Sequence, residues 1–479
     1  MAGFLNNIGN LLNTVSSIAA SASGQALPEK RLSFSRELAP QPREFVLYVG
    51  AYDWGGGTYA AVINTGMMVN PADVKKEDFQ VSVVTISSSS LNSAIGITKG
   101  LRQVDDVFVS DARGNPTTNT SPFITLRFPV GPDVEFSDPF CRNILNAVND
   151  LFGLRIVNEK MNLNITKMTG AVNPLASEFS FNTLASGGIS MQYAYWNPAP
   201  GSEKVPLVIW LHGVTEGGAN PFVPLFGIKS VNLISDQIQK CFPNGASILV
   251  PQCPSTWLET TSVDPMGFRI WEPIDVQGTI KKYAGPLLDL LSKYTSVQNP
   301  MGTTSDGSPI GSTSYYTTAL KSLIDYHIAT NPNIDPKRIY IGGCSAGGYM
   351  TINMLLNYPG YFAAAFPTCE VYVNNKISDE QIRQLAQVPM WFVHARADKT
   401  AKPEIYDEPT VARIMGAGAR DIHFSMYEDV RDLSGQYKDA EGNPQIYDGH
   451  CSWIYVLNND PKENGITLFE WLSKQSLAN

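Results

Sequence analysis

The chain lacks the features that would assign it to a membrane or to a nucleic acid. No apolar run approaches eighteen residues, the length that a membrane-spanning helix needs. Lysine and arginine number 35 against 44 acidic residues, a formal net charge of −9, and no basic run is interleaved with aromatic residues. Binding to a phosphate backbone needs clustered positive charge. We therefore expect a soluble protein with neither a bilayer nor a nucleic acid as a partner.

Cysteine is also scarce. The chain has six cysteines in 479 residues, at positions 141, 241, 253, 344, 369 and 451. So few cysteines in so long a chain do not build a disulfide scaffold. No C-x-x-C pair is present, which removes a common signature of zinc sites. We expect no metal centre.

The N-terminus has no basic segment ahead of its apolar residues. Apolar residues recur at helical spacing from Phe4 to Ile18, with asparagines on the other face. This pattern predicts an amphipathic helix and linker over residues 1–30, docked on a domain or on a neighbouring subunit. Because Ala20-Ser21-Ala22 resembles a cleavage site, a secretory signal is the alternative, although it would normally carry a basic start.

Material for a buried core is plentiful, with 43% hydrophobic and 10% aromatic residues. The length exceeds one ordinary domain, and the sequence pattern changes after a loop-like stretch at 170–188 rich in Ser, Asn, Ala and Gly. We therefore expect two domains, over residues 31–182 and 183–479.

The first domain shows the period-two alternation of half-buried strands. Apolar and polar residues alternate over 79–83, 124–128 and 161–165. Turn-rich breaks such as Gly55-Gly56-Gly57 separate these segments. The pattern predicts an all-β sandwich of the immunoglobulin-like type.

In the second domain, strands alternate with helices. Strands are predicted at 189–196, 206–211, 246–250, 338–342, 363–366, 388–393 and 421–427, and helices at 314–329, after Ser345 and near Val411. This alternation is typical of the α/β class with a doubly wound parallel sheet.

An insertion at about 255–313 interrupts the alternation. Loops of this length are usually functional or disordered, and this one carries several aromatic residues, Trp257 and Trp271 among them. We hypothesise a cap over the active site in which these two tryptophans contact the substrate. The alternative is a surface insertion that packs on its own aromatic residues.

A Gly-x-Ser-x-Gly motif, Gly343-Cys344-Ser345-Ala346-Gly347, lies between a predicted strand and a predicted helix. In such an elbow the serine occupies a strained turn, and small neighbours let strand and helix backbones approach. A serine hydroxyl needs a histidine to take its proton and a carboxylate to orient that histidine. Ser345 is the candidate nucleophile.

The base and the carboxylate follow later in the chain. Of five histidines, only His450 lies in a turn after the last predicted strand. Asp398 follows the strand at 388–393, where a triad carboxylate is expected, and Asp429 and Asp432 are alternatives. The order Ser, Asp, His is that of α/β-hydrolases.

Backbone N–H groups must stabilise the oxyanion of an ester reaction. Ala346, the first residue of the helix after Ser345, provides one donor. Either Gly213 or Val214, in the loop after strand 206–211, provides the second. We assign His212 in that loop a structural role. This chemistry requires no metal and no organic cofactor.

These motifs resemble those of the α/β-hydrolase esterases over residues 189–475. The resemblance rests on Leu211-His212-Gly213, Pro251-Gln252-Cys253-Pro254, Asp335-Pro336, the run from Gly343 to Tyr349, and Trp391-Phe392-Val393-His394 with Asp398. Tyr52-Asp53-Trp54-Gly55 is similar to the domain start of the bacterial branch with an N-terminal immunoglobulin-like domain. The resemblance implies a serine carboxylesterase that forms an acyl-enzyme on a small-molecule ester.

Cys344 precedes the candidate nucleophile and Cys451 follows the candidate base. This arrangement is similar to the feruloyl esterase and tannase family, whose flanking cysteines are bridged. The resemblance implies a Cys344–Cys451 disulfide and short-chain acyl or aryl, feruloyl-type esters; two buried thiols are the alternative. A bridge would favour an extracellular location, and thiols a cytoplasmic one.

Two other functions fit the same pattern. One is a peptidase of the same fold, and the other is a binding protein with a decayed hydrolase domain. The intact set of Ser345, Asp398 and His450 argues against decay. A homo-oligomer could form through the N-terminal helix or through the sandwich.

Overall fold

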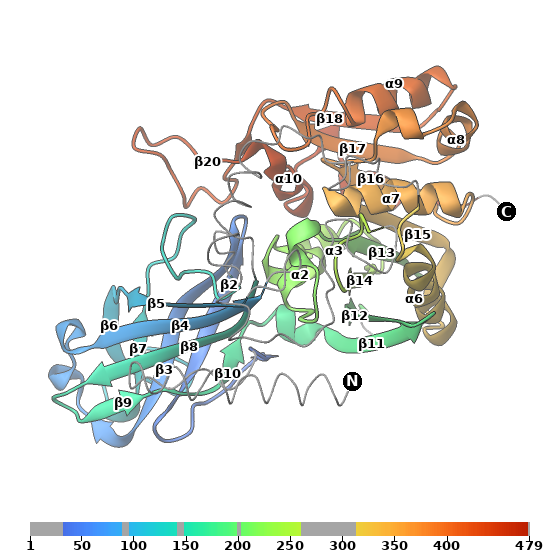
Figure 1. Cartoon of the computed structure of the whole chain (residues 1–479). Helices are drawn as coiled ribbons and strands as arrows, with labels where there is room; N and C mark the ends of the chain where they lie inside the picture. The colour runs from blue at the N-terminus through green and yellow to red at the C-terminus, as the bar shows by residue number, and fades with distance from the viewer. Residues whose placement is uncertain (1–31, 89–94, 141–147, 199–202, 260–312, 478–479) are drawn as a thin grey trace. The chain divides into compact units, whose positions relative to one another are not determined.

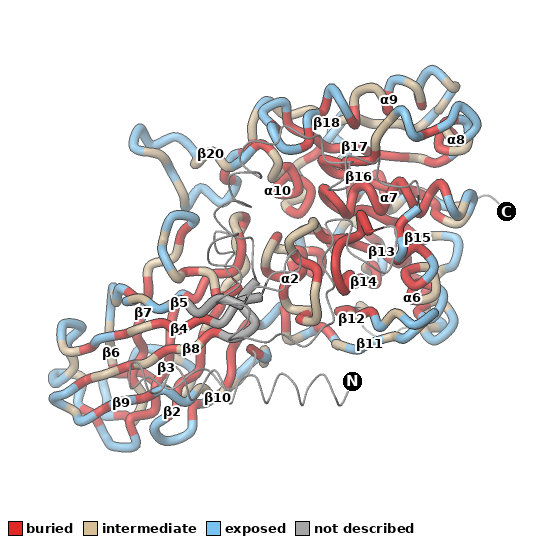
Figure 2. Tube along the Cα trace, in the orientation of Figure 1, coloured by how far each residue is buried: buried red, intermediate tan, exposed pale blue. Residues whose placement is uncertain are grey.

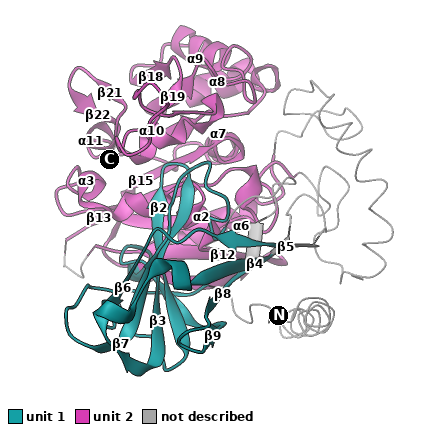
Figure 3. Ribbon diagram, turned by 90° about the vertical axis from the view of Figure 1, so that its left-hand side faces the viewer, with its two compact units in different colours: residues 1–178, 271–297 teal, residues 179–270, 298–479 magenta. Residues whose placement is uncertain are grey.

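The computed structural model describes residues 32–88, 95–140, 148–198, 203–259 and 313–477 (Figure 1). These residues form two compact units, which meet in sequence between Glu178 and Phe179 (Figure 3). The helix predicted within residues 1–30 lies outside the described residues. So does the insertion beyond Glu259, with Trp271.

The first unit is a sandwich of two sheets (Figure 1). One sheet has the order β1 (Phe34–Ser35), β10 (Lys167–Val172), β2 (Glu44–Tyr52), β3 (Gly55–Val69), β7 (Ser121–Arg127) and β6 (Asp106–Ser110). The other has the order β5 (Ile95–Arg102), β4 (Gln80–Ser88), β8 (Val148–Asn158) and β9 (Leu163–Ile165). Three 3-10 turns accompany them, η1 (Pro71–Asp73), η2 (Lys76–Asp78) and η3 (Ala176–Glu178). The predicted immunoglobulin-like sandwich is confirmed.

The predicted alternation is seen in β9, whereas β2 and β3 are buried along most of their length (Figure 2). In β9, Leu163 and Ile165 are buried on either side of the exposed Asn164. Strand β7 differs from the expected alternation because Thr125 is buried as well. Its hydroxyl donates to Ser110 Oγ on β6 at 2.9 Å, so the polar group is satisfied in the interior.

The second unit contains an eight-stranded sheet. Its order is β11 (Ser180–Ser186), β12 (Ile189–Trp196), β14 (Ser247–Gln252), β13 (Val205–Leu211), β15 (Ile334–Cys344), β16 (Ala364–Thr368), β17 (Met390–Ala395) and β18 (Ile422–Tyr427). The pairs β11–β12 and β12–β14 are antiparallel, and the pairs from β14 to β18 are parallel. Each strand that the sequence predicts is present, and the α/β fold is confirmed.

Helices and short hairpins complete this unit. The helices are α2 (Val223–Phe226), α3 (Asp236–Gln239), α6 (Thr317–Thr330), α7 (Ala346–Asn357), α8 (Asp379–Leu385), α9 (Asp407–Gly416), α10 (Trp453–Leu457) and α11 (Leu468–Leu472). The 3-10 turns are η4 (Val214–Glu216), η5 (Ser230–Ile234), η6 (Asn374–Lys376) and η7 (Gly449–Cys451). Two hairpins pair β19 (Val430–Arg431) with β20 (Ile446–Tyr447), and β21 (Lys462–Glu463) with β22 (Ile466–Thr467).

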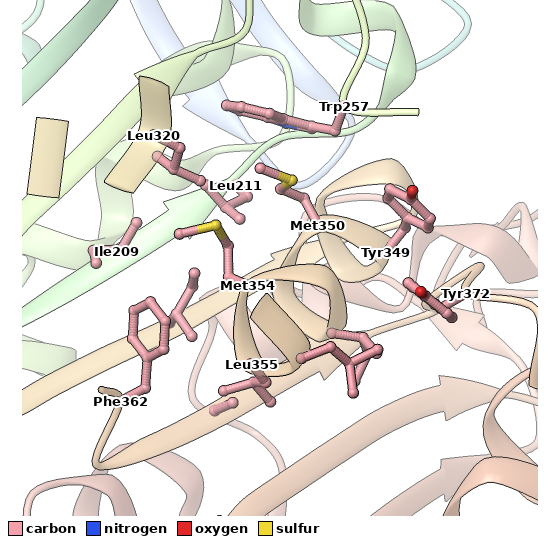
Figure 4. Packing of buried hydrophobic residues seen from close by; sticks show 14 of the residues in the cluster. Ile209, Leu211, Trp257, Leu320, Tyr349, Met350, Met354, Leu355, Phe362 and Tyr372 are labelled. Atoms are coloured by element: carbon pink, nitrogen blue, oxygen red, sulfur yellow. The ribbon is translucent and has the colours of Figure 1, made fainter. Parts of the chain in front are cut away.

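Both faces of the sheet are buried, as β15 illustrates. Ile339 and Ile341 join a core cluster with residues of α6 and α7, such as Leu320 and Met350, part of which Figure 4 shows. Tyr340 between them is also fully buried, and its hydroxyl donates to Gln475 O after α11 at 2.7 Å. Strands buried on both faces have continuous apolar sequences, which explains why these segments were recognisable.

The parallel order fixes where polar residues meet. Strands β13, β15, β16 and β17 are neighbours in that order, so their carboxyl ends lie along one edge of the sheet. In open α/β sheets, ligands bind at this edge.

Candidate active site

Ser345 lies in a strained turn between β15 and α7. Its φ is 56° and its ψ is −117°, values that a residue with a side chain rarely adopts and that cost free energy. Its N–H donates to Thr368 O at 3.0 Å, and its carbonyl accepts from Tyr349 N–H at 2.9 Å. These backbone hydrogen bonds hold the turn in place, as a nucleophile elbow requires.

The glycines of the motif allow the elbow to pack against β13. A Cβ on Gly347 would lie 2.1 Å from Leu211 O, and one on Gly343 would lie 2.5 Å from the same oxygen. Such distances are far below van der Waals contact. The expectation that small residues are required at both positions is confirmed.

His450 lies in the turn η7, which packs against the loop after β17. A Cβ on Gly449 would lie 2.3 Å from Ala397 C, so this glycine permits the close approach. His450 Nδ1 lies 2.7 Å from Asp398 Oδ2. A proton on Nδ1 that is donated to Asp398 leaves the lone pair of Nε2 available as a base. The fold thus brings together two residues that are distant in the sequence.

The Asp398 carboxylate is buried and fully hydrogen-bonded. Its Oδ2 also accepts from His394 Nε2 at 3.0 Å, and its Oδ1 accepts from Thr400 N–H and Ala401 N–H, each at 2.8 Å. Burial alone would raise the pKa of Asp398, but the hydrogen bonds from His394 and His450 hold the pKa well below its ordinary range. The group is therefore ionised at neutral pH.

The two alternative carboxylates have other partners. Asp429 accepts two hydrogen bonds from Arg431, both at 2.7 Å. Asp432 accepts from Ser434, Gly435 and Tyr447. The contact to His450 comes from Asp398.

The geometry distinguishes between the two alternatives for the second oxyanion donor. Gly213 N–H already donates to Glu216 Oε2 at 3.0 Å. Val214 begins η4, and Ala346 begins α7, where backbone N–H groups lack intrahelical partners. Val214 is therefore the better candidate to act together with Ala346.

His212 links two loops at the carboxyl edge of the sheet. Its Nδ1 donates to Gly213 O at 2.6 Å, and its Nε2 accepts from Cys253 N–H at 3.0 Å. Burial lowers the pKa of His212 to about 4, so the ring is neutral and fits this donor and acceptor pair. The interactions are those of a structural residue.

His212 should make the protein sensitive to acid. Its pKa falls from an ordinary 6.5 to about 4 on folding, so the unfolded chain takes up the proton first as pH drops. The stability is present above pH 6.5 and is lost as pH falls towards 4, by on the order of 3 kcal/mol. Urea unfolding at pH 7 and pH 4.5 measures the loss. His212→Asn should show a smaller pH dependence than the wild type, and an equal dependence would contradict this assignment.

The predicted Cys344–Cys451 disulfide is wrong. Both residues are thiols, and no two cysteines in the described part of the chain lie at bridging distance. Adjacency in the sequence to Ser345 and to His450 does not fix where each sulfur points. Cys344 is fully buried at the end of β15, whereas Cys451 is half-buried in the turn η7.

Of the two tryptophans predicted to contact the substrate, only Trp257 is described. Its side chain is fully buried in the cluster of Figure 4. The ring centroids lie 5.3 Å from His212 and 6.3 Å from Tyr316. Its role in substrate binding stays a prediction.

Three further polar residues at this edge, His394, Asp407 and Glu370, were not predicted from the sequence. His394 is fully buried at the end of β17, and its two ring nitrogens contact Asp398 and Asp407. The available signal was a histidine within an otherwise apolar strand, four residues before Asp398.

Comparisons with known proteins match each unit separately. Residues 47–167 match a family described as the esterase immunoglobulin-like N-terminal domain, and residues 320–402 match the prolyl oligopeptidase family. A solved structure described as a thermostable esterase has a TM-score of 0.60 at 20% identity, and covers 90% of this chain and 99% of its own. The combination of an immunoglobulin-like domain with an α/β-hydrolase fold is thereby confirmed.

Other similarities are more limited. Poly(3-hydroxyalkanoate) depolymerase C of Paucimonas lemoignei is 43% identical over 49 residues, which are 10% of this chain and 12% of the relative. This chain thus matches about an eighth of that relative's length. A ferulic acid esterase structure has a TM-score of 0.35 at 11% identity, and covers 62% of this chain and 98% of its own.

Within the described ranges, no helix is both long and apolar enough to cross a membrane. The same residues contain no group of three or more His, Cys, Asp or Glu side chains placed to hold a metal ion.

Proposed function

We propose that the protein is a serine carboxylic ester hydrolase. The observation that carries the proposal is the strained Ser345 at the β15–α7 elbow, on the same sheet edge as the buried Asp398, which contacts the half-buried His450 at 2.7 Å. The esterase descriptions of the matched N-terminal family and of the similar solved structure support it.

The reaction proceeds through an acyl-enzyme. Ser345 Oγ attacks the ester carbonyl while His450 Nε2 takes its proton, and Asp398 stabilises the imidazolium that forms. The N–H groups of Ala346 and Val214 donate to the oxyanion. His450 then gives the proton to the departing alcohol, and a water molecule activated by the same histidine releases the acid.

A peptidase is the second candidate, because the match to the prolyl oligopeptidase family spans Ser345 and Asp398. Hydrolysis of an amide needs the same nucleophile and the same oxyanion donors as hydrolysis of an ester, so the triad does not distinguish a peptidase from an esterase. The leaving group of the preferred substrate, an amine or an alcohol, distinguishes them.

A matched pair of substrates tests the proposal. The full chain should hydrolyse p-nitrophenyl butyrate with a much higher kcat/KM than the p-nitroanilide of the same acid. Faster cleavage of peptide anilides would instead support the peptidase. Turnover of neither substrate class would support a binding protein.

For the substrate class we propose short-chain acyl or aryl esters, with feruloyl esters among the latter. The ring contact of Trp257 with His212, in the loop that leads to the proposed oxyanion donor Val214, supports an aromatic acyl group. Comparing methyl ferulate with esters of two to eight acyl carbons measures the preference.

A further inference from the structure

A second histidine lies directly behind the Asp398 carboxylate. His394 is fully buried at the end of β17. Its Nε2 lies 3.0 Å from Asp398 Oδ2 and 2.7 Å from Ala401 O, and its Nδ1 lies 2.5 Å from Asp407 Oδ2 on α9. Both ring nitrogens therefore face oxygen atoms that accept hydrogen bonds.

These contacts indicate which nitrogens of the His394 ring carry a hydrogen. Ala401 O can only accept, so Nε2 must carry a hydrogen, and the ionised Asp398 adds a second acceptor at the same nitrogen. Nδ1 then needs its own hydrogen for Asp407. Burial alone would lower the pKa of His394, but the charge of Asp407 and hydrogen bonds to both carboxylates raise it to about 10.

Glu370 completes the group on the far side of Asp407. Glu370 Oε1 and Asp407 Oδ1 are buried oxygens that lack a hydrogen-bond donor among the described residues, and the two carboxyl groups interact with each other. A proton on Glu370 that is donated to Asp407 would satisfy both oxygens. Burial and the charge of Asp407 raise the pKa of Glu370 well above its ordinary range. Burial raises the pKa of Asp407 too, but the charge and hydrogen bond of His394 oppose this, so we assign the proton to Glu370 and the negative charge to Asp407.

The other titratable groups that interact with this cluster in the described residues include Tyr406, Cys369 and Tyr372. Burial raises the pKa of the Tyr406 and Tyr372 hydroxyls and of the Cys369 thiol, so all three are neutral at physiological pH. The charged groups of this cluster are therefore the Asp398 and Asp407 carboxylates, with the His394 cation between them. His450 contacts Asp398 at the outer end of the cluster.

We propose that His394 is a positioning residue for the reaction: an imidazolium fixed between Asp398 and Asp407 that holds Asp398 Oδ2 against His450 and balances part of its charge. The inference rests on the proposed esterase function. One oxygen of Asp398, Oδ2, contacts both His394 and His450. The positive charge of His394 therefore limits how strongly Asp398 stabilises a proton on His450.

Two variants separate position from charge. His394→Gln places an amide N–H₂ near Nε2, and so keeps a donor to Asp398 without the cation. The uncompensated carboxylate should then move the acid limb of kcat/KM against pH upward by about one pH unit. His394→Asn keeps a donor near Nδ1 but loses the one to Asp398. We expect it to lower kcat by about 100-fold with KM little changed.

His327→Gln is the matched control, since His327 is also buried but lies within α6 and packs on Tyr195, with ring centroids 4.3 Å apart. It should keep the wild-type pH profile. A wild-type profile and rate in both His394 variants would overturn the proposal, because a merely structural histidine would leave the acid limb in place.

If the His394 variants fail to fold, a measurement on the wild type that needs no substrate turnover still tests the proposal. In long-range ¹H–¹⁵N spectra of the wild type, both His394 nitrogens should show imidazolium shifts from pH 6 to pH 8.5, while an ordinary histidine titrates near 6.5. A neutral tautomer at pH 7 would contradict the ion pair. If the wild type hydrolysed no ester, the proposed esterase function would be wrong. The spectrum would still show independently whether His394 is protonated.

Discussion

Replacing Ser345 with alanine is expected to lower kcat for ester hydrolysis by about a million-fold, by analogy with the loss of a triad serine in subtilisin. Alanine removes the nucleophile, and the oxyanion donors alone give only weak rate enhancement. Both hydrogen bonds described above for Ser345 belong to its backbone, to Thr368 and from Tyr349. The elbow should therefore keep its shape.

The measurement is single-turnover and steady-state kinetics on p-nitrophenyl butyrate, with thermal unfolding as a test of folding. Ser322→Ala is the matched control, because Ser322 lies on α6, where its hydroxyl accepts from Ser186 Oγ at 3.0 Å. This control should retain full activity. A folded Ser345→Ala protein that still hydrolysed the ester at a comparable rate would remove Ser345 as the nucleophile.

Local pattern was enough to predict the elbow and the strands around it. The glycines beside Ser345 are required by contacts within the β13–β15–α7 layer, at distances that no side chain permits. The buried strand β13 is apolar throughout, and β17 is apolar apart from His394, because helices cover both faces of the sheet. At these positions the local packing determines the residue type, so the structure can be recognised from the sequence.

Strand β11 shows where local pattern failed. Residues 170–188 were predicted as a loop, yet Ser180–Ser186 pairs along its whole length with β12. It is an edge strand, and its residues are exposed or half-buried, so the polar sequence lacks the apolar alternation of an inner strand. Gly187 and Gly188, both with positive φ, form the tight turn that makes the pairing possible.

The side chains that meet across the sheet could not be predicted either. The adjacency of Cys344 to Ser345 and of Cys451 to His450 suggested a bridge, but it says nothing about where each sulfur points. The contacts of His394 were missed because its partner Asp407 comes from α9, on another layer. Both errors concern side-chain direction, which one-dimensional spacing does not specify.

Asp398→Asn is expected to lower kcat by about 10⁴-fold, as for the corresponding change in a serine protease triad. The local hydrogen bonds determine how the amide must sit. Thr400 N–H and Ala401 N–H donate to Oδ1, so the amide oxygen takes that position and the N–H₂ group takes the place of Oδ2. The amide then donates to His450 Nδ1, while His394 Nε2–H loses its acceptor on residue 398 and keeps Ala401 O.

This reverses the tautomer of His450. With Nδ1 accepting, the proton resides on Nε2, and that nitrogen can no longer take a proton from Ser345. KM should change little, because the carboxylate does not bind substrate. The same kinetics together with ¹⁵N spectra of His450 test this account, and Asp429→Asn is the control, since Asp429 pairs with Arg431 instead. A variant with wild-type kcat, or with its proton still on Nδ1, would show that Asp398 does not set the tautomer and that the base is oriented by another group.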